Sequence, residues 1–195
     1  MYALEPAAVA LGIINITLLM RRSIWNFPFG IAMGALYAVI FFRARLYAEA
    51  GLQVFFAIVQ VYGWVLWARA GGGDHKVPVR WLQWPGRIGW LVAIAIIAAG
   101  LGTALSLYSD AAAPYPDAAI SAASIAAQFL LSFRRVENWL LWIVIDIGAI
   151  ALYITRDLQL TAGLYGMFLV LSVLGLREWA RAASAPEPHD DEVLQ

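Results

Sequence analysis

The sequence predicts an all-α, polytopic membrane protein with seven transmembrane helices. Of its 195 residues, 63% are hydrophobic and 13% are charged, whereas soluble domains are roughly half apolar and a quarter charged. The mean hydropathy is +0.74. Seven apolar stretches follow one another along the chain, and the second half of the chain repeats the first. Together these observations place the protein in a lipid bilayer.

Each predicted helix is an apolar stretch that approaches the roughly 20 residues needed to cross the hydrocarbon core. In order, the stretches run approximately over residues 6–20, 23–42, 50–68, 88–109, 118–133, 138–155 and 158–176. The first and fifth are short, so an interfacial helix is the alternative for each. Arg21 and Arg22 follow the first stretch, whereas a signal peptide carries its positive charges before its apolar run. We therefore expect the first helix to be retained.

The basic residues predict the orientation of the chain in the membrane. The loops after the odd-numbered stretches, with the C-terminal region, hold ten basic residues: Arg21, Arg22, Arg69, Lys76, Arg80, Arg87, Arg134, Arg135, Arg177 and Arg181. The loops after the even-numbered stretches hold three: Arg43, Arg45 and Arg156. Because basic loops remain in the cytoplasm, the N-terminus is expected outside and the C-terminus inside. The plasma (inner) membrane is the expected location.

An internal repeat predicts the domain organisation. Residues 5–70 align without a gap on residues 117–182, an offset of 112. The alignment pairs Asn26 with Asn138, Gly63 with Gly175 and Trp67-Ala68-Arg69-Ala70 with Trp179-Ala180-Arg181-Ala182. An odd number of spans separates the equivalent helices, so both halves enter the membrane in the same direction, as in other parallel repeats.

The predicted architecture is therefore three plus one plus three helices around a central cleft. It comprises a first three-helix repeat (1–70), a connector with a linker helix (71–116), a second repeat (117–182) and a tail (183–195). The tail holds two prolines with Asp190, Asp191 and Glu192, a composition typical of disorder.

Composition excludes several classes of function. The 13 basic and 13 acidic residues cancel, so nothing indicates a nucleic-acid partner. The absence of cysteine removes disulfides, thiolate metal sites and a cysteine nucleophile. His75 and His189 lie in polar stretches, and the single lysine, Lys76, cannot hold a chromophore inside the membrane. We expect no metal, no cofactor and no catalytic residue, hence a protein that is not an enzyme.

Polar side chains inside apolar stretches mark the predicted substrate path. Asp146 is an acid well inside a predicted span, where a carboxylate costs roughly 2.5–3.5 kcal/mol on insertion scales. Trp139, Trp142 and Asp146 are spaced i, i+3 and i+7, so they share one helix face. Asn138 begins the same helix. These four residues are candidates for substrate binding.

Two further polar faces point to the same interior. The third stretch carries Gln53, Gln60, Trp64 and Trp67 on one face. The fifth carries Ser121, Ser124, Gln128 and Ser132. Such residues also hold membrane helices together, and tryptophan also anchors helices at the interface. Gln53, Gln60, Trp64 and Gln128 join the candidate substrate-binding residues. We assign Gln60, Gln128 and Trp142 to the cavity, and Trp67 and Trp179 to interfacial anchoring.

Amides, a carboxylate and indole rings together suit an aromatic ligand that carries hydroxyl groups. Indole faces also attract a cation. A pyridinium nucleoside fits this description, as do thiamine and a riboflavin-like molecule, and composition alone does not separate them.

Two sets of motifs resemble the PnuC family of vitamin transporters. In the first half they are residues 26–31 (NFPFGI), 41–56 (FFRARLYAEAGLQVFF) and 62–67 (YGWVLW). In the second half they are residues 137–142 (ENWLLW), Asp146, Leu152-Tyr153 and residues 160–165 (LTAGLY). One departure is Leu158-Gln159, where the family pattern leads us to expect Leu-Tyr.

The resemblance implies a nicotinamide riboside transporter with a SWEET-like fold, homotrimeric and working by facilitated diffusion, that supplies NAD synthesis once the riboside is phosphorylated in the cytoplasm. The family's Asn-Trp-x-x-Trp motif corresponds to Asn138, Trp139 and Trp142, and its Leu-Gln to Leu52-Gln53. Tyr165, at the end of the last motif, joins the candidate substrate-binding residues. Some relatives carry thiamine, riboflavin or deoxynucleosides instead.

The sequence holds no phosphate-binding Gly-x-x-x-x-Gly-Lys loop, so ATP is not expected to drive transport. A uniporter is therefore the predicted mechanism. A membrane-embedded enzyme and a non-transport scaffold are the alternatives from other classes, and saturable binding of a vitamin distinguishes a transporter from both.

Overall fold

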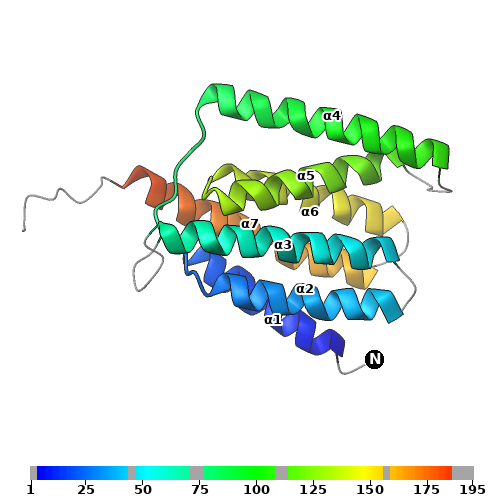
Figure 1. Cartoon of the computed structure of the whole chain (residues 1–195), viewed down its shortest axis with the longest axis horizontal. Helices are drawn as coiled ribbons and strands as arrows, with labels where there is room; N and C mark the ends of the chain where they lie inside the picture. Colours follow the sequence, from blue (N-terminus) through cyan, green and yellow to red (C-terminus); the bar gives the residue numbers. More distant parts are fainter. Residues whose placement is uncertain (1–3, 44–46, 71–76, 109–113, 156–158, 186–195) are drawn as a thin grey trace, which may run out of the picture.

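The computed structural model describes residues 4–43, 47–70, 77–108, 114–155 and 159–185, and these residues form an all-α structure. Seven helices account for most of them (Figure 1). They are α1 (Leu4–Met20), α2 (Asn26–Arg43), α3 (Tyr47–Arg69), α4 (Trp84–Tyr108), α5 (Pro114–Ser132), α6 (Glu137–Thr155) and α7 (Gln159–Ser184). The only isolated bridge among these residues pairs Arg80 with Arg135.

The helix boundaries differ from the predicted apolar stretches where polar residues are accommodated at helix ends. α4 begins at Trp84 rather than near residue 88, because Arg87 in its first turn forms an ion pair with Glu137 (2.8 Å). α5 begins at Pro114, since proline is tolerated in a first helical turn. α7 continues to Ser184 and so includes Ala183 and Ser184, the first two residues of the expected tail. The predicted disordered segment beyond residue 185 lies outside the described residues.

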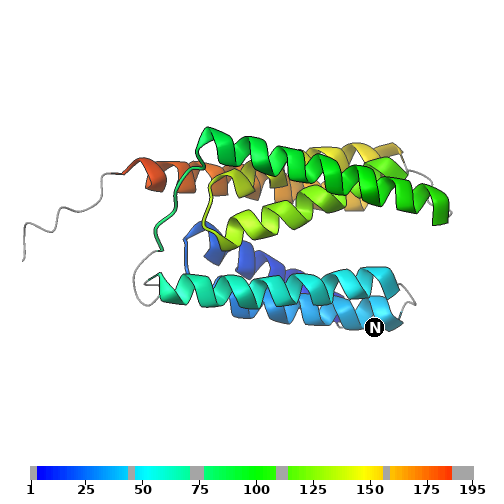
Figure 2. The same ribbon diagram turned by 45° about the horizontal axis from the view of Figure 1, so that its top comes forward.

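The helices form two groups that lie side by side (Figures 1 and 2). In one group α2 packs between α1 and α3, and in the other α5 packs between α4 and α6, with α7 against α6. Contacts between the groups run from α3 to α5 and from α1 to α7. α1 and α5, the two short predicted spans, thus lie alongside longer helices in the bundle.

The helices α1 and α5 each end in a turn of the same type. Arg22 and Arg134 adopt left-handed backbone conformations, with φ of 58° and 59°. After α1, Arg22 N donates to Leu19 O (2.9 Å) and Ser23 N to Leu18 O (3.0 Å). After α5, Arg134 N donates to Leu131 O (2.9 Å) and Arg135 N to Leu130 O (2.8 Å). Both are Schellman turns, in which the last helical carbonyls find backbone partners.

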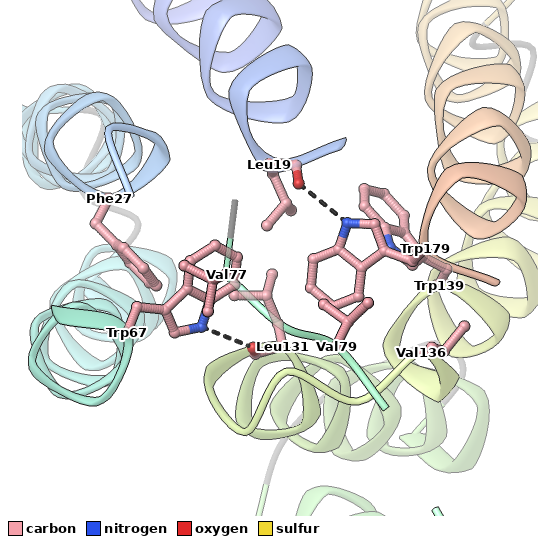
Figure 3. Packing of buried hydrophobic residues seen from close by; sticks show 9 residues of the cluster. All are labelled: Leu19, Phe27, Trp67, Val77, Val79, Leu131, Val136, Trp139 and Trp179. Atoms are coloured by element: carbon pink, nitrogen blue, oxygen red, sulfur yellow. Dashed lines mark hydrogen bonds between the residues drawn. The ribbon is translucent and has the colours of Figure 1, made fainter. Parts of the chain in front are cut away.

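A buried cluster joins the two groups at the end of the molecule where these turns lie. Trp67 Nε1 of α3 donates to Leu131 O at the end of α5 (3.3 Å), and Trp179 Nε1 of α7 donates to Leu19 O at the end of α1 (3.1 Å) (Figure 3). Both indoles are fully buried and their rings are in tilted contact, with centroids 5.9 Å apart. The prediction that Trp67 and Trp179 act as interfacial anchors is therefore wrong, because each indole binds a turn of the opposite group.

The segment before α4 lies across both turns. Val77 N donates to Arg22 O (3.4 Å), Arg80 N to Arg134 O (3.1 Å), and Val136 N to Arg80 O (3.2 Å). The side chains of Val77 and Val79 are buried in the same cluster as the two indoles (Figure 3). The backbone of the connector thus holds the two turns in a fixed relation.

The surface of α4 is apolar and largely uncovered. α5 is the helix that α4 packs against, and Leu91 and Ile96 of α4 are 62% and 66% exposed. Within the described residues, Gly51–Arg69 and Trp84–Tyr108 are long and apolar enough to span a membrane, while the apolar helices Ala10–Met20 and Asn26–Ile40 are shorter. An exposed apolar helix of this length is typical of a helix in contact with lipid or with another membrane protein.

Close packing at Gly175 yields a stability prediction. A Cβ at Gly175 would lie 2.6 Å from ring carbons of Trp139, whereas a Cβ at Gly166 on the same helix meets nothing within 4 Å. Gly175→Ala should therefore destabilise the protein by roughly 1–3 kcal/mol, whereas Gly166→Ala should be neutral or stabilise it by up to about 1 kcal/mol. Differential scanning fluorimetry of the detergent-solubilised variants measures both. Equal melting temperatures for the two variants would contradict the packing described.

Candidate functional site

The start of α6 places two unpartnered polar atoms in the protein interior. Asn138 is fully buried, and its Nδ2 donates to Arg135 O (2.6 Å), which caps the preceding turn. Among the residues that the structure describes, its Oδ1 has no hydrogen-bond partner, and neither has Nε1 of the neighbouring Trp139, which is 2% exposed. Because buried polar groups are normally hydrogen-bonded, this acceptor and this donor are candidate contacts for a ligand. Asn138 thus has a structural role that the sequence did not predict, because its Nδ2 caps a turn. Its Oδ1 remains a candidate contact for a ligand.

Trp139 is held in place by its ring contacts. It packs edge to face on Trp179, with centroids 5.7 Å apart at 87°, and against Gly175 of α7. The partly buried Trp142, one helical turn further on, packs against the same cluster. The tryptophan pair predicted from the sequence is therefore assembled at the junction of the two groups of helices.

Two turns further along α6, Asp146 faces α7. Its side chain is 4% exposed, and its Oδ2 accepts a hydrogen bond from Ser172 Oγ (3.0 Å). Within the described residues no cation pairs with this carboxylate, so its charge is offset by one hydroxyl. A buried acid with one neutral partner is suited to a cationic ligand.

The first group of helices contains a separate polar cluster. Gln60 of α3 is buried, and its amide lies against Gly30 of α2 together with the amide of Asn15 of α1. Asn15 Nδ2 donates to Asn26 O (2.6 Å). Gln60 was predicted as a cavity residue and is in this cluster, whereas Asn15 was missed. Asn15 has a visible signal, since it is an amide inside the first apolar stretch.

The remaining predicted residues are dispersed. Gln53 is partly buried, with its amide close to Gly34 of α2. Gln128 of α5 is buried, and its backbone oxygen accepts a hydrogen bond from Ser132 Oγ (3.0 Å). Trp64 is 38% exposed on α3. Tyr165 of α7 is partly buried and packs on Phe168.

The structure thus places Asn138, Trp139, Trp142 and Asp146 along α6 and brings Asp146 into contact with Ser172, which the sequence analysis missed. Ser172 is a serine in an apolar stretch, so only its position opposite Asp146 distinguishes it from a helix-packing serine. Gln60 lies in the other group. Ser132, from the predicted polar face of α5, lines one of the two described surface cavities, which adjoin α4 and α5. None of the candidate substrate-binding residues lines either cavity. No group of three or more His, Cys, Asp or Glu side chains in the described ranges converges to hold a metal.

The chain is similar to known transporters. Residues 2–181 match the family described as "Nicotinamide mononucleotide transporter". The chain is 28% identical to the nicotinamide riboside transporter PnuC of Escherichia coli strain K12, over 92% of this chain and 86% of that protein. It is also 28% identical to the riboflavin/roseoflavin transporter RibM of Streptomyces davaonensis, over 87% and 80% of the two chains.

A solved structure resembles the fold described above. It is the crystal structure of the vitamin B3 transporter PnuC, with a TM-score of 0.76 and 26% identity, covering 92% of this chain and 81% of that one. The family match spans nearly the whole chain, and sequence relatives and fold agree with it. The chain therefore belongs to the PnuC nicotinamide riboside transporter family, a family of transporters and not of enzymes.

Proposed function

We propose that this protein transports nicotinamide riboside across the membrane by facilitated diffusion and so supplies NAD synthesis. The observation that carries the proposal is the family match along residues 2–181, together with the PnuC relatives of similar length. The geometry at α6 is consistent with it. A riboside offers hydroxyl and carboxamide groups for Asn138 Oδ1 and Trp139 Nε1, and a pyridinium charge for Asp146.

The proposed architecture is a parallel repeat of three plus one plus three helices in a SWEET-like arrangement, with residues 1–70 and 117–182 as repeats, 71–116 as connector and 183–195 as tail. Matched contacts 112 residues apart support it. Trp67 and Trp179 donate to Leu131 and Leu19, respectively. The two Schellman turns also correspond. Asn26 and Asn138 cap equivalent turns, with Nδ2 donating to Ser23 O (2.7 Å) and Arg135 O (2.6 Å).

As a member of a transporter family the chain is a membrane protein. We place all seven helices across the inner membrane, with the N-terminus outside and the C-terminus in the cytoplasm. The distribution of basic residues supports this orientation, since Arg22, Arg80, Arg134 and Arg135 gather at one end of the bundle. The homotrimer implied by the family remains part of the proposal.

In this mechanism the chain binds the riboside without forming a covalent bond. Trp139 and Trp142 provide ring surfaces for the pyridinium, which indole attracts through its π face. Asn138, Gln60 and Gln128 are proposed to orient the sugar and the carboxamide, with Gln53, Trp64 and Tyr165 as further contacts. The end of the molecule with the Trp67 and Trp179 bonds is closed by side chains, so we assign it as the closed gate of an alternating-access cycle.

A second candidate substrate is riboflavin, favoured by the similarity to RibM at the same 28% identity. Riboflavin shares the aromatic ring and the hydroxyl groups but is neutral. Asp146 therefore distinguishes the two substrates, because a carboxylate stabilises a cation more than a neutral ring system.

Transport in proteoliposomes tests the facilitated-diffusion mechanism. We expect riboside inside the vesicles to approach the outside concentration and to stop there, with the same final level with or without a pH gradient. Radiolabelled uptake measures this level, and protein-free vesicles are the control. Accumulation above the outside concentration, driven by the gradient, would contradict a uniporter.

Replacing Trp139 or Trp179 by phenylalanine distinguishes a ligand contact from a structural one. Trp139→Phe removes an N–H that has no hydrogen-bond partner among the described residues, so riboside affinity should fall by roughly tenfold. Trp179→Phe removes the hydrogen bond to Leu19 O. It should therefore lower the free energy of unfolding by about 1 kcal/mol more than Trp139→Phe does. Isothermal titration calorimetry and melting temperatures measure the two effects. Unchanged affinity in Trp139→Phe would remove this N–H from the site.

Neutralising Asp146 tests both its role and the substrate. Asp146→Asn retains the shape and a hydrogen-bonding group for Ser172, so a cationic riboside should lose roughly tenfold in affinity and riboflavin much less. Titration of both ligands against wild type and variant gives the comparison. An equal loss for the two ligands would show that the charge of Asp146 does not recognise the pyridinium.

A further inference from the structure

A basic cavity and an apolar groove adjoin each other on the side of the bundle formed by α4 and α5. The cavity, of about 290 Å³, lies at the end of α5, and Arg134 and Arg135 are among the residues that line it. The groove, of about 270 Å³, runs between α4 and α5 and is lined by apolar residues alone. Trp90 and Phe133 line both, so the two spaces adjoin each other at these rings.

No acid in the described part of the chain neutralises the positive charge in the cavity. Glu137, the acid that follows the two arginines in the chain, accepts hydrogen bonds from Arg87 Nε (2.8 Å) and from the backbone N of Leu82 (3.0 Å). Among the residues that the structure describes, neither Arg134 nor Arg135 has an acidic partner. Burial, with the charges of Arg135 and Arg80, lowers the pKa of the Arg134 guanidinium from its ordinary value. The site is thus electrostatically complementary to an anion.

The backbone fixes the position of this charge. Arg134 occupies the left-handed position of the Schellman turn, and its carbonyl accepts the hydrogen bond from Arg80 N. The arginines therefore project from a constrained turn rather than from a free loop.

The groove continues from the charged end toward the middle of the helices. A row of parallel rings begins it, with Trp90 on Phe129 (centroids 6.5 Å apart, 29°) and Phe129 on Phe133 (6.4 Å, 23°). From Trp90 to Ile97 the groove follows two turns of α4, a length of about 10 Å. Tryptophan at the mouth and aliphatic residues beyond it match the depth profile of a bilayer from head group to chain.

We propose that the adjoining cavity and groove together bind an anionic phospholipid, with the head-group phosphate on Arg134 and Arg135 and one acyl chain along the groove between α4 and α5. Basic pockets between transmembrane helices bind anionic head groups in this way. Charge complementarity at one end and a purely apolar channel at the other require an occupant with both features. This ligand is distinct from the transported substrate, and the proposal does not depend on the substrate's identity.

Native mass spectrometry of the purified protein in neutral detergent, with added phosphatidylglycerol or phosphatidylcholine of the same acyl chains, tests the proposal. Wild type should retain phosphatidylglycerol preferentially. The double substitution Arg134→Gln/Arg135→Gln should weaken that retention roughly tenfold or more. Arg69→Gln, at the exposed end of α3, removes one positive charge at the same end without touching the cavity and should retain the lipid as wild type does.

The groove is tested by a second pair of variants, which decides the matter if the double arginine variant fails to fold. Ala93→Phe fills the groove and should weaken phosphatidylglycerol binding severalfold, whereas Ala99→Phe, on the exposed part of α4, should leave it unchanged. Equal retention of the two lipids, or wild-type retention in Ala93→Phe, would overturn the proposal. Displacement of the lipid by millimolar inorganic phosphate would identify a site for free anions and would also overturn it.

Discussion

The structure depends on two indole N–H groups, each of which donates to a backbone carbonyl at the end of a helix in the opposite group. Trp67 reaches Leu131 O and Trp179 reaches Leu19 O. An unpaired N–H or carbonyl at a fully buried position costs about 1–3 kcal/mol, so each bond selects a single arrangement of the two groups. These carbonyls belong to the two Schellman turns at Arg22 and Arg134, and the backbone of the connector is hydrogen-bonded to both turns. The position of α6, and with it the candidate site, follows from this junction.

Much of the fold could be predicted from the sequence because apolar stretches of helical length leave little choice of secondary structure. The ends of α4 and α7 could not, since they depend on the pairing of Arg87 with Glu137 and on how far packing continues. Trp67 and Trp179 were misassigned for a related reason. In the sequence, a tryptophan at the end of an apolar stretch looks the same whether its side chain contacts lipid head groups or a carbonyl that is distant in sequence. The offset of 112 contained the clue, because it pairs both tryptophans and both carbonyl residues.

The candidate site could be predicted only in part, because some of its residues stand out in the sequence and others do not. Asp146 is conspicuous, because an acid inside an apolar stretch is costly without a purpose. Its partner Ser172 is an ordinary residue for a membrane helix, and only the packing of α6 on α7 reveals it. The two halves use equivalent positions differently. Gly34 and Gln60 stand where the second half has Asp146 and Ser172, and Gly30 stands where it has Trp142. The proposed repeat thus carries an asymmetric set of polar groups, which suits a ligand with two unlike ends.

The reciprocal tryptophan bonds also bear on how such a chain could arise. Each half supplies one indole and one carbonyl, and the other half supplies their counterparts. If the proposed repeat is shifted by 112 residues, the two bonds exchange places. Two identical copies of a single half, related by a twofold axis, would therefore satisfy both bonds with one tryptophan and one turn each. Fusion of such copies through α4 would preserve the junction, and after fusion the two halves could diverge without loss of the contacts that hold them together.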